Sequence, residues 1–238
     1  MDVKNMKKKN SKTIGILGGM GPHASNELYR LLIEKSISIY GVKNNEDFPE
    51  ILLNSIPVVD FISDTANIPK ARQLLIERTK QLNIFGVSVL CIACNTAHLL
   101  IDDLRNVSSV PFISITDEVK TIVTEKKYQR IGLLASITTY ETGLYNKLNS
   151  TGQKLFIPTS KFQLLLEDCI RAVIAGKIST QLKKKLNTSV QLFINENKLD
   201  VLILGCTELP LIFQKKINIP TINTLEVLAE SLLRFYYE

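Results

Sequence analysis

The sequence lacks several features that would mark whole classes of protein. It contains no tryptophan, and aromatic residues make up only 7% of its 238 residues, so nothing indicates an aromatic binding surface. No apolar run approaches the roughly 20 residues needed to cross a bilayer. Four cysteines in a chain of this length do not form a disulfide framework. We therefore expect a soluble, cytoplasmic protein with reduced thiols and no membrane partner.

The positive charge is concentrated at the N-terminus. Residues 1–12 carry five lysines and one aspartate, so +4 of the formal net charge of +6 lies there. Such a lysine-rich segment is typical of a disordered, solvated tail, which we assign to residues 1–11. The apolar run TIGIL that follows is short and has no small-residue cleavage site, so it does not form a signal-peptide pattern. Arginines and aromatics are not interleaved, and we expect no nucleic-acid partner.

Short apolar runs alternate with longer stretches in which apolar residues recur every three to four positions. The expected strands are Thr13–Leu17, Ile51–Ser55, Val87–Ile92, Pro111–Ile115, Arg130–Leu134, Val201–Leu204 and Thr221–Asn223. The expected helices are Ala24–Lys35, Ala71–Leu82, Phe162–Ala175 and Leu182–Asn195. This alternation is typical of a parallel sheet covered by helices on both faces, so we predict an α/β fold.

The two halves of the chain resemble each other. TIGILGGMG (13–21) resembles RIGLLASIT (130–138), and VSVLCIACNTAHLL (87–100) resembles LDVLILGCTELPLI (199–212). The similar segments occur in the same order in both halves. This pattern predicts a duplicated α/β unit.

A glycine-rich turn, GMGPHA (19–24), follows the first expected strand and fits the pattern of a dinucleotide-binding turn. However, the second strand ends in LLNS (52–55) without a carboxylate for the ribose, and Pro22 removes a backbone donor. The N–H groups of residues 19–21 can hold a carboxylate as readily as a phosphate. The turn alone therefore leaves open a nucleotide-dependent oxidoreductase, a plain binding protein, or a site for a smaller anion.

Two cysteines are expected at the carboxyl ends of buried strands, each directly before a helix. Ligands bind at this edge of open α/β sheets, and a helix N-terminus favours the thiolate form of Cys94 and Cys206. Asn95, Thr96 and Thr207 follow them, and these residue types cap helices and can contact a bound carboxylate. Racemisation needs one base on each face of a carbon atom. One thiol in each half would provide that pair.

The remaining cysteines and the nearby titratable residues have several interpretations. Cys91 lies inside its strand, three residues before Cys94, so the two side chains point to opposite faces, which argues against redox or zinc use of the CxxC. No second ligand pair is visible, and we expect no metal site. Cys169 falls on the apolar face of a helix. His98 could assist as a base or be a hydrogen-bonding neighbour, and Glu208 has the same two interpretations.

Three motifs in this order resemble the aspartate/glutamate racemase family: GILGGMGP (15–22), CNTAH (94–98) and GCTELP (205–210). The resemblance implies two similar flavodoxin-like α/β domains with parallel sheets, related by a pseudo-twofold axis, with the active site in the cleft between them. The expected domains are 12–108 with 220–238, and 109–219.

The resemblance also implies an amino-acid racemase that acts on a small-molecule substrate without pyridoxal phosphate or another cofactor. Cys94 and Cys206 would be its two proton donors and acceptors. Family members are often dimers, so we expect a homodimer. The expected substrate contacts, taken from the resemblance and from the residues themselves, are Met20, Asp60, Asn95, Thr96, Ala97 and Thr207.

Two positions depart from the family's pattern for aspartate. Val59 and Ile174 stand where aspartate-specific members place an arginine and a lysine, so a second substrate carboxylate would be unpaired. Asp60 could instead meet a basic or polar side chain, and a broad-specificity enzyme for neutral or basic amino acids therefore competes with an aspartate or glutamate racemase. The alternative is a related cysteine-dependent isomerase or decarboxylase of a small dicarboxylic acid.

Overall fold

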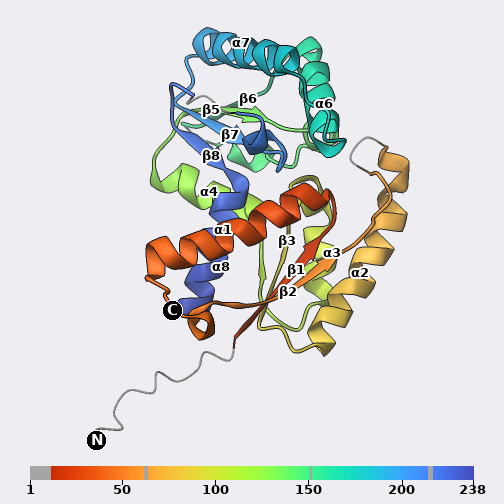
Figure 1. Cartoon of the computed structure of the whole chain (residues 1–238). Helices are drawn as coiled ribbons and strands as arrows, with labels where there is room; N and C mark the ends of the chain where they lie inside the picture. The colour runs from red at the N-terminus through yellow and green to blue at the C-terminus, as the bar shows by residue number, and fades with distance from the viewer. Residues whose placement is uncertain (1–11, 62–63, 151, 214–216) are drawn as a thin grey trace, which may run out of the picture.

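The computed structural model describes residues 12–61, 64–150, 152–213 and 217–238, which form two four-stranded parallel sheets (Figure 1). The strand orders are β2-β1-β3-β4 and β6-β5-β7-β8, so the two halves have the same topology. The prediction of an α/β fold with two similar halves is confirmed. The basic tail predicted for residues 1–11 lies outside the described residues. Within the described ranges, no helix is both long enough and apolar enough to span a bilayer.

The first sheet contains β1 (Thr13–Gly18), β2 (Glu50–Ser55), β3 (Val89–Ile92) and β4 (Phe112–Ile113). The second contains β5 (Arg130–Leu134), β6 (Lys154–Phe156), β7 (Val201–Leu204) and β8 (Thr221–Asn223). The α-helices are α1 (Pro22–Tyr40), α2 (Ile68–Ile84), α3 (Ile101–Val107), α4 (Ile115–Glu125), α5 (Ile137–Glu141), α6 (Ser160–Ile174), α7 (Thr180–Asn197) and α8 (Thr224–Tyr237). The short 3₁₀ helices used below are η3 (Thr96–Leu100), η4 (Asn146–Leu148) and η5 (Leu209–Leu211).

The expected strands are present, with shifted ends. The strand predicted over Pro111–Ile115 shortens to two residues because Ser114 already caps α4, its hydroxyl accepting the N–H of Asp117 at 3.4 Å. Strand β6 was not expected from the sequence, since it is a three-residue edge strand that begins with an exposed lysine. The central strands β1, β3 and β7 are buried along their whole length, which agrees with helices on both faces of each sheet.

The last strand and helix of each half join the two halves. Strand β4 pairs with β3 and β8 pairs with β7, whereas the ranges predicted for the domains assign each of these strands to the other half. In the sheets, β4 thus belongs with the first half and β8 with the second, and the domain ranges themselves stay a prediction. Helix α8 follows β8 of the second sheet but packs against α1 of the first half, and α4 packs against α8 and η4.

One apolar core passes through both halves. It contains Ile14 of β1 and Leu28 of α1 together with Ile131 of β5, Ile203 of β7 and Leu228 of α8. Two further clusters cover the outer faces of the sheets, beneath α2 and α3 in the first half and beneath α6 and α7 in the second. The two halves are thus joined by a shared core.

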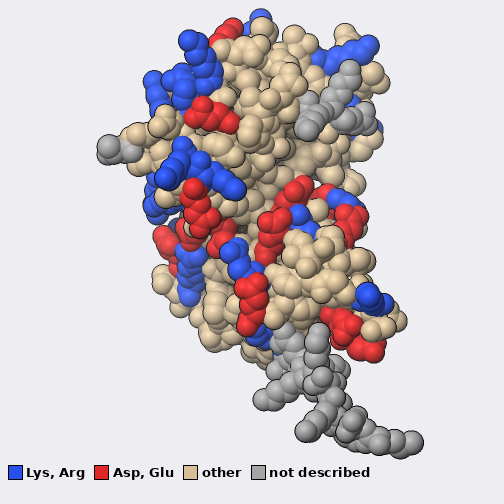
Figure 2. All heavy atoms as spheres, turned by 90° about the vertical axis from the view of Figure 1, so that its left-hand side faces the viewer, with Lys and Arg blue, Asp and Glu red and all other residues tan. Residues whose placement is uncertain are grey.

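Ion pairs join the crossing helices at the surface. Lys35 of α1 is 2.8 Å from Glu230 of α8, and Arg234 of α8 is 3.6 Å from Glu118 of α4. Figure 2 shows that basic and acidic side chains are interspersed on this face of the molecule. Exposed pairs of this kind contribute little to stability, so the shared apolar core is the main link between the halves.

The position of α8 leads to a first prediction. We expect Leu228→Ala to lower the free energy of unfolding by about 2–5 kcal/mol, because the fully buried Leu228 side chain leaves a cavity in the shared core. Leu192→Ala on α7 is the control, since that side chain is 54% exposed, and it should change the free energy by less than about 0.5 kcal/mol. Urea unfolding of both variants measures this, and equal destabilisation by the two variants would contradict it.

Candidate active site

Cys94 and Cys206 occupy equivalent places in the two halves. Strands β3 and β7 hold the same position in their sheets, and each cysteine lies two residues beyond the carboxyl end of its strand. Both side chains are buried, with 2% and 6% exposure. Hydrogen bonds join these two strand ends: Asn95, next to Cys94, donates to Oγ1 of Thr224 at 2.9 Å, and Oγ1 of Thr224 donates to the carbonyl oxygen of Leu204 in β7 at 3.0 Å. We call the region between the two strand ends the cleft.

The two thiols lie within electrostatic reach of each other. Burial raises the pKa of the Cys94 thiol to about 12, and the charge of Glu208 acts in the same direction. Burial raises the pKa of Cys206 well above its ordinary value, the charge of Glu208 adds to this, and the charge of Cys94 raises it further. Backbone N–H groups of Thr96 and Ala97 partly offset the shift at Cys94. Both cysteines are therefore neutral thiols in the free protein at neutral pH.

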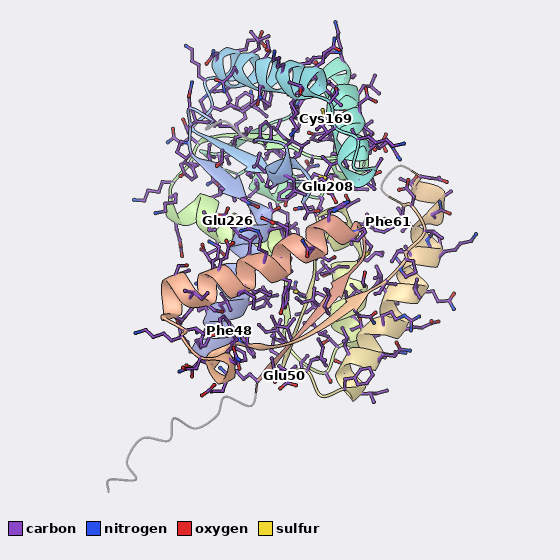
Figure 3. All side chains as sticks on the ribbon, viewed as in Figure 1. Phe48, Glu50, Phe61, Cys169, Glu208 and Glu226 are labelled. Atoms are coloured by element: carbon purple, nitrogen blue, oxygen red, sulfur yellow. The ribbon has the colours of Figure 1, made fainter. Side chains whose placement is uncertain are left out.

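A buried carboxylate lies beside Cys206. Oε2 of Glu208 accepts hydrogen bonds from Sγ of Cys206 at 3.1 Å and from Oγ1 of Thr207 at 2.9 Å. Its other oxygen, Oε1, is buried and has no hydrogen-bond partner among the described residues. A Cβ atom on Gly21 would lie 3.3 Å from Oε1, so the glycine turn of the first half and Glu208 of the second lie directly beside each other. Figure 3 shows Glu208 between the two sheets, on the same side of the molecule as Phe61.

The residues after Cys94 bind the second half of the protein. Nδ2 of Asn95 donates to Oγ1 of Thr224 at 2.9 Å, and Oη of Tyr145 donates to Oδ1 of Asn95 at 2.5 Å. Oγ1 of Thr96 is 3.0 Å from Oγ of Ser136. These bonds fix the position of the Cys94 loop relative to the second half. The roles of Asn95, Thr96, Ala97 and Thr207 as substrate contacts stay predictions.

His98 holds the cysteine loop in place. Its Nδ1 is 2.8 Å from the carbonyl oxygen of Cys94, and its Nε2 accepts the N–H of Ile115 at 2.9 Å. Burial lowers its pKa to about 4, so the ring is neutral, with the proton on Nδ1. Of the two interpretations of His98, this geometry favours a hydrogen-bonding neighbour over a base.

The glycine turn offers fewer donors than expected. The N–H of Gly19 donates to Oγ of Ser25 at 2.8 Å, within the same turn. Of the three N–H groups predicted to hold an anion, those of Met20 and Gly21 remain candidates. The turn also supplies one wall of a cavity between the two halves.

This cavity has a volume of 230 Å³ and lies between the glycine turn, the loop after β2 and helix α6. Val59, Asp60 and Ile174 line it, together with Met20. Two of the predicted substrate contacts, Met20 and Asp60, thus line this cavity beside the two apolar residues that depart from the family's aspartate pattern. Neither Cys94 nor Cys206 lines it, and we call it the mouth.

Two charged residues of the cavity were not anticipated from the sequence. Arg171 of α6 is 3.4 Å from Oδ2 of Asp60 and 3.2 Å from Oε1 of Glu167. Arg171 lies one helical turn before Ile174, and this spacing could have identified it. The mouth therefore holds one cation between two carboxylates.

The other two cysteines lie in the core. Cys91 is buried within β3 and Cys169 is buried in α6, and neither forms a disulfide. Among the residues that the structure describes, no group of three or more His, Cys, Asp or Glu side chains could hold a metal ion.

Comparison with known proteins gives consistent matches along the chain. A family model described as Asp/Glu/hydantoin racemase matches residues 17–232. The broad specificity amino-acid racemase RacX of Bacillus subtilis (strain 168) is 26% identical over 226 residues, covering 94% of this chain and 97% of that protein. The Picrophilus torridus aspartate racemase structure has a TM-score of 0.77 at 26% identity, covering 94% of each chain. An aspartate racemase homologue from Pyrococcus horikoshii OT3 has a TM-score of 0.79 at 25% identity, covering 95% of this chain and 100% of that one.

The buried, neutral His98 should make stability depend on pH. Because burial lowers its pKa from 6.5 to about 4, its contribution is present above pH 6.5 and is lost as the pH falls towards 4. We expect the loss to approach about 1.4 kcal/mol per pH unit in this interval. Denaturant unfolding at pH 7.0 and pH 4.5 measures it, and His98→Gln should lose less stability than wild type between these two pH values. His23→Gln, at an exposed position, is the control, and identical pH dependence in the two variants would contradict the assignment.

Proposed function

The chain belongs to the Asp/Glu/hydantoin racemase family, and from this premise we propose that it interconverts L- and D-amino acids by two-base proton transfer, with Cys94 on one face of the α-carbon and Cys206 on the other. The single observation that supports this most is the pair of buried thiols at equivalent strand ends, close enough that the charge of Cys94 acts on Cys206. The similarity to a broad specificity amino-acid racemase agrees with the proposal.

The reaction needs two bases because a single base would mostly return the proton to the face it left. In one direction the thiolate of one cysteine removes the α-proton and becomes a thiol, while the opposite thiol gives its proton to the other face and becomes a thiolate. In the reverse direction the roles exchange. The two thiols supply both proton transfers, so we propose that no pyridoxal phosphate or other cofactor takes part.

Proton transfer alone does not account for the rate. General acid–base catalysis contributes roughly 10²–10⁴-fold, and the α-proton of an amino acid is very weakly acidic. Fixed N–H donors in a dry site stabilise the negative charge that spreads onto the substrate carboxylate. The N–H groups of Met20 and Gly21 are the proposed donors, since they lie at the start of α1 where the cavity opens.

The mouth of the cleft favours neutral or basic side chains. Val59 and Ile174 are apolar, and Arg171 is already paired with Asp60 and Glu167. A second substrate carboxylate would have to break one of these pairs, whereas an ammonium or an apolar side chain would not. We therefore propose broad specificity for neutral or basic amino acids rather than for aspartate. A cysteine-dependent isomerase or decarboxylase of a dicarboxylic acid is the competing function.

We also propose that the protein is a cytoplasmic homodimer. Buried, unpaired cysteines agree with a reducing compartment. The dimer rests on the resemblance to the family.

The two cysteines can be tested separately in D₂O. We expect Cys94→Ser and Cys206→Ser each to reduce racemisation by at least about 10²-fold, since each removes one of the two bases. Each variant should retain α-hydrogen exchange from one enantiomer only, and the two should retain opposite ones. Mass spectrometry and chiral chromatography measure exchange and inversion.

The matched control for this experiment is Cys169→Ala, which removes a buried thiol from α6 outside the cleft. It should keep kcat/KM within a few-fold of wild type. If Cys206→Ala racemised as fast as wild type, the two-thiol mechanism would be wrong.

A screen of the twenty L-amino acids by chiral chromatography tests the substrate class. We expect neutral or basic amino acids to have a higher kcat/KM than aspartate, because the only cation of the described cavity residues is already paired. Val59→Arg should raise the kcat/KM for aspartate relative to the best substrate by at least about tenfold, by providing a partner for the second carboxylate. Leu164→Arg, exposed on α6 outside this cavity, is the control. Aspartate as the best wild-type substrate would refute the assignment.

A further inference from the structure

We infer that the carboxylate of Glu208 binds the α-ammonium group of the substrate and thereby selects free α-amino acids against hydroxy acids, dicarboxylic acids and cyclic amides, which lack this cation. The inference rests on the proposed function, because it concerns the same cleft. It assigns a binding role to a residue that the proton transfers themselves do not use.

The first step is that the buried carboxylate of Glu208 has no counter-ion among the described residues. Its side chain is 2% exposed, and its two hydrogen bonds, from Cys206 and Thr207, both go to Oε2. Oε1 has no partner within the described part of the chain, and neither oxygen takes part in an ion pair there. A buried carboxylate without a counter-ion is costly, so such a group is normally paired. An ammonium group carries three N–H donors and one positive charge, which is the partner that Oε1 lacks.

The second step is the position of that oxygen. Oε1 lies directly beside Gly21, since a Cβ atom on this glycine would be only 3.3 Å from it, and Gly21 also lines the cavity at the mouth. Glu208 does not itself line this cavity, so Oε1 lies behind Gly21, next to the cavity wall. The unpaired oxygen therefore adjoins the cavity through which we propose that the substrate enters.

The third step is the orientation that this contact gives. In this arrangement Glu208 binds the substrate ammonium, and the N–H groups of Met20 and Gly21 bind its carboxylate. The substrate is therefore held at two points, one in each half of the protein. The α-carbon is bonded to both groups and therefore lies between the halves. Sγ of Cys206 is 3.1 Å from the same carboxylate, so the α-carbon is held beside a thiol. Fixing a reactant in this way lowers the entropic part of the barrier.

The fourth step concerns the charge of the thiols. The charge of Glu208 raises the pKa of both Cys94 and Cys206, after burial, and so opposes the thiolate that catalysis needs. A bound ammonium cancels that charge and makes thiolate formation easier. The arrangement therefore links activation of the thiol to the arrival of a cationic substrate group.

The experiment compares two ligands that differ only at the α position. The probes are the amino acid with the highest kcat/KM in the screen and the 2-hydroxy acid with the same side chain. Titration calorimetry on the intact protein gives both dissociation constants. Wild type should bind the amino acid at least about tenfold more tightly, and Glu208→Gln should lose this preference, because the amide carries no charge for the ammonium.

A loss of fold or of general site geometry would weaken both ligands equally, so the ratio of the two dissociation constants isolates the ammonium contact. In Glu208→Gln we expect the amino acid to bind at least about tenfold more weakly and the hydroxy acid to stay within about twofold of wild type. Glu208→Asp keeps the charge and should retain part of the preference. Glu50→Gln, at the start of β2 and labelled in Figure 3, is the control and should change neither constant.

Failure of the inference differs from failure of the proposed function. If no amino acid is racemised by wild type, the proposed function is wrong. If wild type racemises an amino acid but shows no preference over the hydroxy acid, or if Glu208→Gln keeps the preference or weakens both ligands equally, the ammonium site is wrong.

Discussion

Two thiols and a carboxylate buried in one cleft cannot all be ionised without a counter-charge. Cys94, Cys206 and Glu208 are each at most 6% exposed, and the charge of Glu208 reaches both sulfur atoms. In the free protein this cost is met by keeping both cysteines protonated. To remove the α-proton, one cysteine must nevertheless become a thiolate. The free-energy cost of its buried charge therefore has to fall when the substrate binds. A zwitterionic substrate brings one positive and one negative group, and the positive one can compensate a buried anion without leaving a charge of its own.

The fold holds the two halves of this cleft together through α4 and α8. Each helix follows the last strand of one sheet and packs against elements of the other half, so the shared apolar core fixes the distance between the two strand ends. Polar contacts refine that position. Asn95 bonds Thr224 and Tyr145 of the second half, and His98 ties the Cys94 loop to the start of α4. The same side chains that follow Cys94 in the sequence thus determine where its sulfur atom lies.

The strands and long helices could be predicted because their apolar periodicity reflects burial directly. The edge strand β6 and the sheet membership of β4 and β8 could not, since a two- or three-residue strand leaves no periodic pattern and its partner is chosen by tertiary packing. The cysteines were identifiable as strand-end residues of a repeat. The state of His98 was not, because it depends on the N–H of Ile115, which comes from another element. Arg171 was missed although its helical spacing from Ile174 was readable.

The two halves are alike at the thiols and unlike around them, and the reaction explains why. Enantiomers of one amino acid can share the positions of the ammonium, the carboxylate and the side chain while the α-hydrogen changes face. The groups that bind those three substituents can therefore differ between the halves, with a carboxylate in one and a glycine turn in the other. Only the proton donors must be matched. Duplication of an α/β unit supplies the matched pair, and later divergence of the surrounding residues, such as Thr96 against Glu208, is compatible with it. The cysteines that both repeats keep therefore account for the reaction, and the residues that differ between the repeats account for the substrate specificity.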